Sequence, residues 1–388
     1  MRPDMQRTLD ILTRLIAFDT TSDRSNLALI HFVRDLLAEH GIQATVLPNA
    51  EGDKASLLAT IGPPVAGGVV LSGHTDTVPV TGQTWSQAPY QATLKEGRLY
   101  GRGSVDMKGF IGLCLAMVPQ FLASPLKRPI HLAFSYDEES TCMGCLPLID
   151  HMRETLPEVA AVIIGEPTQG RVVSAHKGVH SWRTEVTGVP AHSSRPDLGV
   201  SATFYAARII SELERTANEL RTNATRGELF EPPYSTLHVS AMQGGNAPNI
   251  IAKDARLHWE LRNLPSDPPD AVRARFDDFT AQLAREMQQH SADCRIQTLE
   301  DYASVPALTP EPDGKAEALA FALTGQSERC GVGFCSEAGW FQDRGFSTVV
   351  CGPGSIAQAH KADEYIEMAE LERYLDFLAR LMQHQCAD

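Results

Sequence analysis

The order of the expected strands and helices changes in the middle of the 388-residue chain, and this change constrains the fold more than any other feature. On both sides of the middle, short apolar runs with strand character alternate with longer runs at helical spacing. The expected elements there are strands over residues 69–71, 130–134, 159–164 and 346–350 and helices over residues 107–122 and 368–382. Alternation of this kind is typical of an α/β domain.

The middle of the chain follows the order strand, helix, strand, strand, helix, strand, which is the split βαβ arrangement of ferredoxin-like domains. Pro268 and Pro269 suit the start of the second helix, where a missing N–H group costs little. The expected elements are strands over residues 181–186, 236–241, 255–261 and 294–299 and helices over residues 201–220 and 270–289. We therefore predict a discontinuous α/β domain over residues 1–177 and 305–388, with an α+β domain inserted over residues 178–304.

The composition narrows the classes of partner and compartment. A formal net charge of −14 disfavours a nucleic-acid partner, because such proteins gain affinity from clustered Lys and Arg. No apolar run approaches the length of a membrane span, and the amphipathic start lacks the apolar core of a signal peptide. Eight cysteines without such a signal are typical of reduced thiols. We expect a cytoplasmic protein that acts on a small molecule, with neither nucleic acid nor membrane as a partner.

Histidines and carboxylates follow several of the expected strands. Because ligand sites in open α/β sheets collect outside the carboxyl ends of the strands, these side chains should converge although they lie far apart in the sequence. Asp106, in a Gly-rich loop just before a helix, joins them. The residues at strand ends are His74, Glu138, Glu139, Glu166 and His360.

This residue set indicates a metal site. Two histidines with at least three carboxylates fit zinc, cobalt or manganese better than the all-oxygen site of calcium. One carboxylate can bridge two ions, which leaves a histidine and a further carboxylate for each. Asp76, two residues after His74, could accept the second ring N–H of that histidine. Taken alone, a His-X-Asp or an adjacent Glu pair is more often a solvated surface feature, but carboxylates beside apolar runs are expensive unless paired or metal-bound.

Two further patterns resemble sites and carry less weight. Cys142 and Cys145 form a single CxxC pair, which without a second pair is a weak zinc signal, and we expect ordinary semi-buried thiols. The glycines of residues 244–245 and 352–354 lack the spacing of a nucleotide-binding loop. We interpret them as turns that allow close approach of the backbone to a substrate.

The chain resembles the di-zinc aminoacylase and desuccinylase family over nearly its whole length. The segments that carry the resemblance are residues 72–79, 101–109, 137–139, 165–168, 190–194 and 358–360. The resemblance implies a zinc-peptidase-like catalytic domain with an inserted ferredoxin-like domain that serves for dimerisation and as a lid. It also implies a pair of divalent metal ions, zinc first, with cobalt or manganese as alternatives.

Carried over to this sequence, the family's motifs imply a role for each site residue. His74 and Glu166 would hold one metal ion, Glu139 and His360 the other, and Asp106 would bridge them, with Glu138 as the general base and Asp76 behind His74.

Three further residues of the inserted domain and one glycine are implied in substrate handling. His192 would reach the active site of the partner subunit in a homodimer, and Arg262 would bind the substrate carboxylate, with Asn249 and Gly354 as further contacts. The simpler interpretations are that His192 is a turn residue capping the backbone and that Arg262 is a solvated strand arginine.

The implied reaction is removal of a small acyl group from an N-acyl amino acid. A desuccinylase, an acyl-lysine deacylase and a carboxypeptidase-like peptidase are alternatives within the family. A non-catalytic binding protein with a degenerate metal site would lack a ligand or the base, and this sequence lacks neither.

Overall fold

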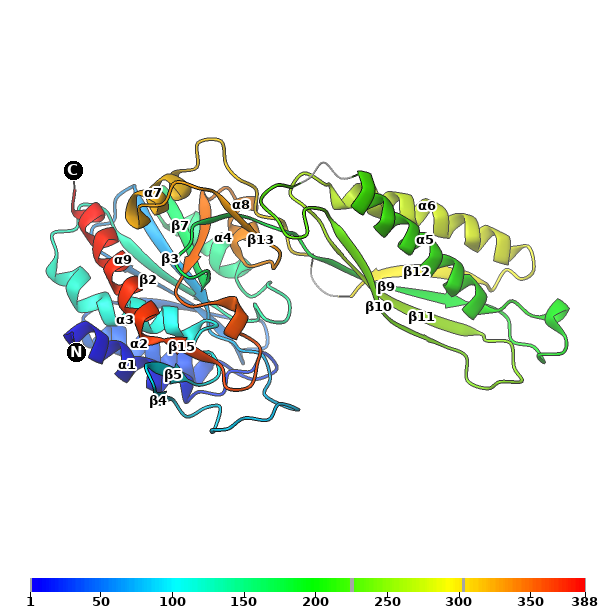
Figure 1. The fold of residues 1–388 in the computed structure, drawn as a ribbon, viewed down its shortest axis with the longest axis horizontal. Coiled ribbons are helices and arrows are strands. Elements are labelled where there is room, and N and C mark those ends of the chain that lie inside the picture. Colours follow the sequence, from blue (N-terminus) through cyan, green and yellow to red (C-terminus); the bar gives the residue numbers. More distant parts are fainter. Residues whose placement is uncertain (1, 224–226, 302–303, 388) are drawn as a thin grey trace. The chain divides into compact units, whose positions relative to one another are not determined.

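The computed structural model describes residues 2–223, 227–301 and 304–387. The chain divides into two compact units, here called unit 1 and unit 2 (Figure 1). Unit 1 consists of Met1–Ala175, Thr309–Gly331 and Ser336–Asp388, and unit 2 consists of His176–Leu308 and Val332–Cys335. The short segment Val332–Cys335 departs from the sequence prediction, which left it outside the inserted part; in the structure the Lys177 N–H donates to the Val332 carbonyl oxygen over 3.4 Å.

Unit 1 is built on an eight-stranded sheet in the order β1-β2-β6-β3-β7-β14-β8-β13. The neighbours β6, β3, β7 and β14 run parallel to one another, whereas β1, β2 and β8 pair antiparallel. The carboxyl ends of the four parallel strands therefore meet at one edge of the sheet. The strands are β1 (Ala44–Pro48), β2 (Ala55–Ile61), β3 (Gly68–His74), β6 (Ile130–Ser135), β7 (Val159–Pro167), β8 (Val173–His176), β13 (Cys330–Val332) and β14 (Thr348–Gly352).

The central strands are covered on both faces, as their continuous apolar runs require. Every residue of β3, β6 and β14 is buried. Alternate strand positions such as Leu71 and Ile163 share one hydrophobic cluster with five helices, while the intervening positions Val70 and Ile164 are buried outside it, on the face where α4 and α8 contact the sheet. The five helices are α1 (Pro3–Ile16), α2 (Leu27–Glu39), α3 (Lys108–Ala123), α7 (Lys315–Thr324) and α9 (Met368–Cys386); α4 is Leu146–Thr155 and α8 is Ala338–Asp343.

A small second sheet of unit 1 joins the segment before Asp106 to the segment after His360. It has the order β15-β5-β4, with Tyr365 paired to Tyr100. Its strands are β4 (Thr93–Lys95), β5 (Arg98–Tyr100) and β15 (Tyr365–Glu367). The loop after β5 leads to Asp106, and the segment before β15 contains His360. The described residues also include two short 3-10 turns, Pro196–Leu198 in unit 2 and Ile356–Gln358 in unit 1.

Unit 2 has an antiparallel four-stranded sheet in the order β10-β11-β9-β12 with two long helices packed against it (Figure 1). Buried and less buried residues alternate along β9 and β11, as expected for a sheet covered on one face. Its core includes Trp259, whose ring centroid lies 4.4 Å from that of Trp182 and 4.5 Å from that of Phe276. The elements are β9 (His180–Thr187), α5 (Ala202–Asn223), β10 (Thr236–Gly244), β11 (Asp254–Arg262), α6 (Pro269–Gln288) and β12 (Arg295–Glu300). The predicted α/β fold with an inserted ferredoxin-like α+β part is confirmed.

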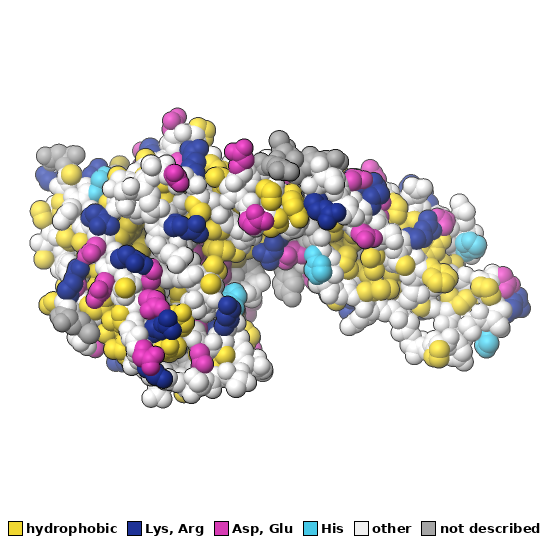
Figure 2. Space-filling view, viewed as in Figure 1, with side chains coloured by type: hydrophobic (Ala, Val, Ile, Leu, Met, Phe, Trp, Pro, Cys, Tyr) yellow, Lys and Arg dark blue, Asp and Glu magenta, His cyan; other side chains and the backbone are white. Residues whose placement is uncertain are grey.

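The surface carries charges of both signs. On the visible face of unit 1, basic and acidic side chains are interspersed despite the net charge of −14 (Figure 2). Within the described ranges, no helix has both the length and the apolar character that crossing a membrane would require.

Candidate metal centre

The predicted ligands of unit 1 meet at the carboxyl edge of the parallel strands. β3 ends at His74, which lies in register with Ser135 at the end of β6, and the Glu138–Glu139 pair follows that strand. Glu166 lies near the end of β7. His360 follows β14, and Asp106 lies two residues before α3. The sheet thus collects side chains from five separate segments, because parallel strands end on the same side.

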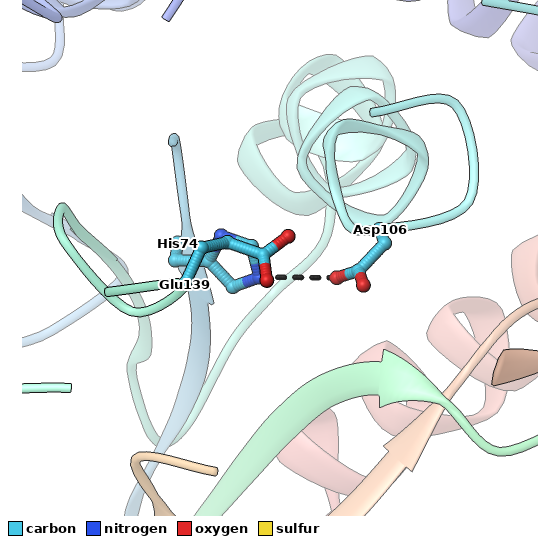
Figure 3. A group of neighbouring side chains, drawn as sticks. All are labelled: His74, Asp106 and Glu139. Carbon is cyan, nitrogen blue, oxygen red and sulfur yellow. Dashed lines mark hydrogen bonds and ion pairs between the residues drawn. The ribbon is translucent and has the colours of Figure 1, made fainter. Parts of the chain in front are cut away.

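Asp106 lies between the two histidines. Its Oδ1 is 3.1 Å from His74 Nε2, and its Oδ2 is 3.2 Å from His360 Nε2. Each histidine has a further carboxylate neighbour: Glu166 Oε1 lies 3.5 Å from His74 Nε2, and Glu139 Oε2 lies 2.9 Å from His360 Nε2. In Figure 3, Asp106 projects from the loop before α3 toward His74 at the end of β3, and Glu139 lies beside them. One oxygen of Asp106 therefore faces each histidine.

Two groups of these side chains have ligand atoms close enough to share a cation. One consists of His74, Asp106 and Glu139, and the other of His74, Glu138 and Glu166; within each group the atoms lie within 4.8 Å of one another. The groups distribute the acids differently from the predicted pairs, since Glu138 Oε2 also lies 3.9 Å from His74 Nε2. The structure thus brings the predicted base into the same cluster as the predicted ligands.

The cluster concentrates negative charge in a buried place. The side chains of Asp106, Glu139 and Glu166 are each 6% exposed, and that of Glu138 is 11% exposed. Glu139 Oε1 is buried without a hydrogen-bond partner in the structure. Burying several carboxylates together is costly unless a positive charge compensates them. A borderline divalent cation with His and carboxylate ligands fits this donor set and would give the orphaned oxygen a partner.

The ionisation of the cluster follows from burial and crowding. Burial, with repulsion from Asp106, raises the pKa of Glu139 to about 7, against a hydrogen bond with His360. Burial and the charge of Asp106 likewise raise the pKa of Glu166 well above its usual value. Burial alone would raise the pKa of Asp106, but hydrogen bonds with His360 and His74 outweigh it and lower that pKa. Asp106, which lies between the two histidines, therefore ionises more readily than Glu139 or Glu166.

The two histidines are the positive partners of these acids. Hydrogen bonds with Asp106 and Glu139 raise the pKa of His360 to about 10, against burial. Burial opposes protonation of His74, yet hydrogen bonds with Asp106 and Asp76 raise its pKa well above the usual value. Protons on the histidines thus occupy the electrostatic position that a cation would take.

Asp76 does more than the sequence predicted. His74 Nδ1 lies 3.0 Å from the Asp76 backbone oxygen and 3.4 Å from its Oδ1, so the backbone oxygen is the nearer acceptor. The Asp76 carboxylate accepts the backbone N–H groups of Glu138 and Glu139 over 3.1 and 3.2 Å, and the Ser22 hydroxyl over 2.6 Å. Asp76 therefore holds both the histidine and the turn that presents the two glutamates.

The CxxC pair consists of buried thiols rather than the semi-buried thiols expected. α4 begins directly after Cys145. Cys142 Sγ lies 3.4 Å from Glu138 Oε1 and 3.2 Å from the Glu138 backbone oxygen. The thiol of Cys142 therefore packs against the predicted base.

Sequence reasoning gave no role to Glu337, which is 1% exposed beside the cluster. Burial raises its pKa to about 7, against a hydrogen bond with Ser135 at the end of β6 and the charge of His74. Its Oε1 has no hydrogen-bond partner in the structure. Glu337 directly precedes α8, and an acid at the start of a helix resembles an ordinary exposed residue in the sequence. No local signal distinguishes it, because its burial depends on packing against β6.

The substrate residues predicted in the inserted part lie in unit 2. His192 is exposed; its Nδ1 lies 2.8 Å from Ser194 Oγ and accepts the Ser194 backbone N–H over 3.2 Å. Asn249 is its neighbour, since the Ser193 N–H donates to the Asn249 backbone oxygen over 3.0 Å. Arg262 ends β11, with Nε donating to Glu260 Oε1 over 2.7 Å and a side chain 38% exposed. His192 therefore makes the turn contact, and Arg262 is a partly exposed strand arginine, as the simpler interpretations expected. The roles of both residues toward the substrate stay predictions.

Gly354 lies in unit 1 in a left-handed conformation with φ of 81°. A Cβ atom there would lie 2.3 Å from Val105 Cγ2, next to Asp106. Any side chain would thus displace the loop that carries Asp106. Close packing against Val105 thus explains the glycine at this position. The contact of Gly354 with the substrate stays a prediction.

The sequence pattern of peptidase family M20/M25/M40 matches residues 70–384. The chain belongs to this family. It is 33% identical over 385 residues to the acetylornithine deacetylase of Proteus mirabilis (strain HI4320), covering 99% of this chain and 96% of that protein. As a member of the M20/M25/M40 family with such relatives, the chain is a hydrolase that acts on amide bonds, and the resemblance found in the sequence is confirmed.

Solved structures of M20-type peptidases share the fold. A tripeptidase from Staphylococcus aureus subsp. aureus Mu50 superposes with a TM-score of 0.78 at 18% identity, covering 98% of each chain. The Bacillus subtilis YxeP protein, described as a dinuclear metal-binding peptidase of the M20 family, superposes with a TM-score of 0.65 at 14% identity, covering 98% of this chain and 97% of that one. These similarities show a common architecture.

Proposed function

We propose that the chain removes the acetyl group from N-acetyl-L-ornithine to give ornithine and acetate, as a step of arginine biosynthesis. The observation that carries the proposal is similarity along 99% of the chain to a relative named acetylornithine deacetylase. The segments 175–178, 335–338 and 352–365 resemble that enzyme as well. The buried cluster of unit 1 supports a metal-dependent amide hydrolase in general, because its donor set suits a Lewis-acidic cation.

In the proposed centre His74 and Glu166 hold one divalent ion, His360 and Glu139 hold the other, and Asp106 bridges them. The distances from each oxygen of Asp106 to one histidine support this division. Zinc is the first candidate, with cobalt or manganese as alternatives, because all three accept mixed imidazole and carboxylate ligands. When bound, the pair would polarise the amide carbonyl and make a water molecule more acidic.

Glu138 is the proposed general base. Its carboxylate would take the proton of the attacking water and return it to the amine nitrogen as the C–N bond of the amide breaks. Asp76 fixes the backbone of Glu138 through a 3.1 Å hydrogen bond, which keeps the carboxylate at the edge of the cluster. The Cys142 thiol, 3.4 Å from Oε1, limits its rotation further.

The chain would work as a homodimer through unit 2. β10 is an edge strand of its sheet, and residues from Ser240 to Gly244 are exposed. Phe204 on α5 is 75% exposed and Met242 on β10 is 44% exposed. An open strand edge beside exposed apolar side chains favours pairing with a second copy of the same surface.

His192 would donate to the carbonyl oxygen of the substrate in the partner subunit as negative charge develops there. Arg262 would bind the substrate carboxylate, with Asn249 and Gly354 as neighbouring contacts. The positive guanidinium suits a free α-carboxylate, which all the alternative N-acyl amino acids share. The acyl group and the amino-acid side chain therefore need a direct assay.

The test is a hydrolysis assay of the zinc- or cobalt-loaded protein on N-acetyl-L-ornithine, N-succinyl-diaminopimelate, N-acetyl-lysine and a dipeptide. The proposal expects the highest kcat/KM for N-acetyl-L-ornithine and no activity after chelation, with recovery when metal is restored. Preference for another substrate would replace the proposed substrate but keep the hydrolase. Full activity in rigorously demetallated protein would overturn the metal centre.

A further inference from the structure

A buried ion pair lies directly behind the candidate metal centre. Arg102 Nη1 is 2.7 Å from Glu364 Oε2, and both side chains are 1% exposed. The same carboxylate oxygen accepts the Gly103 N–H over 2.9 Å, while Oε1 accepts the N–H groups of Val105 and Asp106 over 2.9 and 3.1 Å. Glu364 thus receives four hydrogen bonds from the loop that ends at Asp106, three of them from backbone N–H groups.

The other end of Arg102 reaches the segment of His360. Arg102 Nη2 donates to Gln83 Oε1 over 2.6 Å, and Gln83 Nε2 donates to the His360 backbone oxygen over 3.0 Å. Trp85 holds the same amide through its Nε1, 3.1 Å from Gln83 Oε1, and its ring lies 5.0 Å from the Arg102 guanidinium carbon. A continuous chain of hydrogen bonds therefore links the backbone of Asp106 to the backbone of His360.

This chain restrains the part of the centre that regular structure holds least. His74 and Glu166 lie within β3 and β7 of the central sheet. His360 instead lies in a loop, has a φ of 60° and has a side chain 54% exposed. Since a left-handed residue outside regular structure needs surrounding contacts to keep its conformation, the bond from Gln83 bears on His360 in particular.

We infer that Glu364, Arg102 and Gln83 are positioning residues that set the cation position formed by Asp106, Glu139 and His360, and that their loss weakens this position more than the one formed around His74 and Glu166. The inference rests on the two-cation centre proposed above. Substitution of a residue that hydrogen-bonds a metal ligand commonly lowers the affinity for the cation by about tenfold to a hundredfold. Removing one member of a buried pair also leaves the other charge unpaired, so Glu364 is expected to matter more than Gln83.

The experiment compares full-length Gln83→Met, Glu364→Gln and Glu367→Gln chains with the unmodified chain. Gln83→Met removes the donor to His360 and keeps the side-chain length. Glu367→Gln is the matched control, because Glu367 is three residues from Glu364 but pairs with Arg98 at the surface, 2.9 Å apart and with side chains 42% and 40% exposed. Each metal-free protein is titrated with zinc in the presence of a competing chelator, and its thermal unfolding is measured separately.

The unmodified chain and Glu367→Gln should bind two equivalents of zinc with the same affinities. Gln83→Met should keep one of the two affinities and lose about tenfold or more in the other, and Glu364→Gln should lose at least as much. If Glu364→Gln does not fold, Gln83→Met decides the question alone. The Gln83 side chain is partly exposed, so its substitution should leave the chain folded. Unchanged affinities in Gln83→Met, or equal losses at both positions, would overturn the inference while leaving the centre in place. An unmodified chain that bound no zinc would overturn the centre itself, and the inference with it.

Discussion

Unit 1 contains a fully buried ion pair, whereas several of the short ion pairs described in unit 2 involve exposed side chains. In unit 1 the Arg102–Glu364 pair and the cluster around Asp106 are buried, with Arg102 and Glu364 each 1% exposed. In unit 2 pairs such as Arg208–Glu286 lie at the surface, with side chains 46% and 44% exposed. Buried charge must be compensated, whereas exposed pairs contribute little to stability. The buried acids of unit 1 therefore need a compensating positive charge, which a cation would supply.

The sheets differ in the same sense. Every position of β3 is buried, and His74 of the cluster lies at the end of this strand. β11 alternates between buried and less buried residues, so polar side chains such as Arg262 lie along one whole face. Chemistry in unit 1 is therefore concentrated at a strand edge, and contacts in unit 2 are spread over an exposed face.

The largest expected effect tests whether two adjacent acids of unit 1 have different roles. Glu138→Ala should keep near-normal zinc content and lose about a hundredfold or more in kcat, as expected when a general base is removed. Glu139→Ala should lose zinc, because it removes the acid 2.9 Å from His360. Metal analysis and steady-state kinetics on the same samples separate the two effects. The reverse pattern of metal content would exchange the assigned roles.

A smaller effect is expected in unit 2, from His192. Its substitution by alanine should lower kcat by about a hundredfold if it donates to the developing oxyanion. Mixing His192→Ala with Glu138→Ala chains should restore activity, because a heterodimer then has one site with both groups intact. Random exchange would give about a quarter of the unmodified activity per site.

The outcome of mixing also decides between the interpretations of His192. No recovery would mean that the histidine serves its own chain. A His192→Ala protein that is fully active before mixing would leave only the turn contact with Ser194, 2.8 Å away. Either result would remove the contrast between a cation-binding unit 1 and a unit 2 that completes the partner's site.

The smallest expected effect is a pH dependence of stability that arises from the buried cluster of unit 1. Burial raises the pKa of Glu139 in the folded protein to about 7. The stability that this carboxyl group contributes is therefore complete below its pKa in the unfolded chain and is lost as pH rises through 7. His360 has a pKa raised to about 10, so its contribution is complete below its unfolded value and is lost as pH rises through 10. The metal-free protein should therefore unfold at progressively lower temperature as pH rises across these two ranges.

Zinc should flatten this profile, because a bound cation replaces the protons. Glu139→Gln should remove the part near pH 7, whereas Glu286→Gln in unit 2 should leave the profile unchanged, since that pair is exposed. Thermal unfolding of chelated and zinc-loaded samples at several pH values is the measurement. A profile that zinc does not alter would separate the buried acids from cation binding.

Much of the centre could be predicted from the sequence because its logic is local. An apolar run such as residues 69–71 identifies a buried strand, and a histidine directly after it must lie at the edge of the sheet. The same argument located Glu139 and Glu166, and the structure brings all three into one cluster. Helical spacing likewise predicted α3 and α9 to within a few residues of their observed ends.

Other features depended on contacts that local patterns do not contain. The Asp76 carboxylate binds the backbone of Glu138, 62 residues away in the chain, and Glu364 binds that of Asp106, 258 residues away. The sequence predicted Asp76 only as a partner of the His74 ring, and it gave no role to Glu364. Their burial follows only when separate strands and loops have packed, which is also why Glu337 had no recognisable signal.

The sequence by itself determined the alternation of buried strands and helices, the inserted ferredoxin-like order and the residue types at the strand ends, because periodicity and chain direction act over a few residues. Tertiary structure alone decided which oxygen of Asp106 faces which histidine and that Glu364 lies behind Asp106. It also placed Val332–Cys335 with unit 2. These outcomes depend on distances between segments far apart in the chain, and no local pattern of side chains specifies such distances.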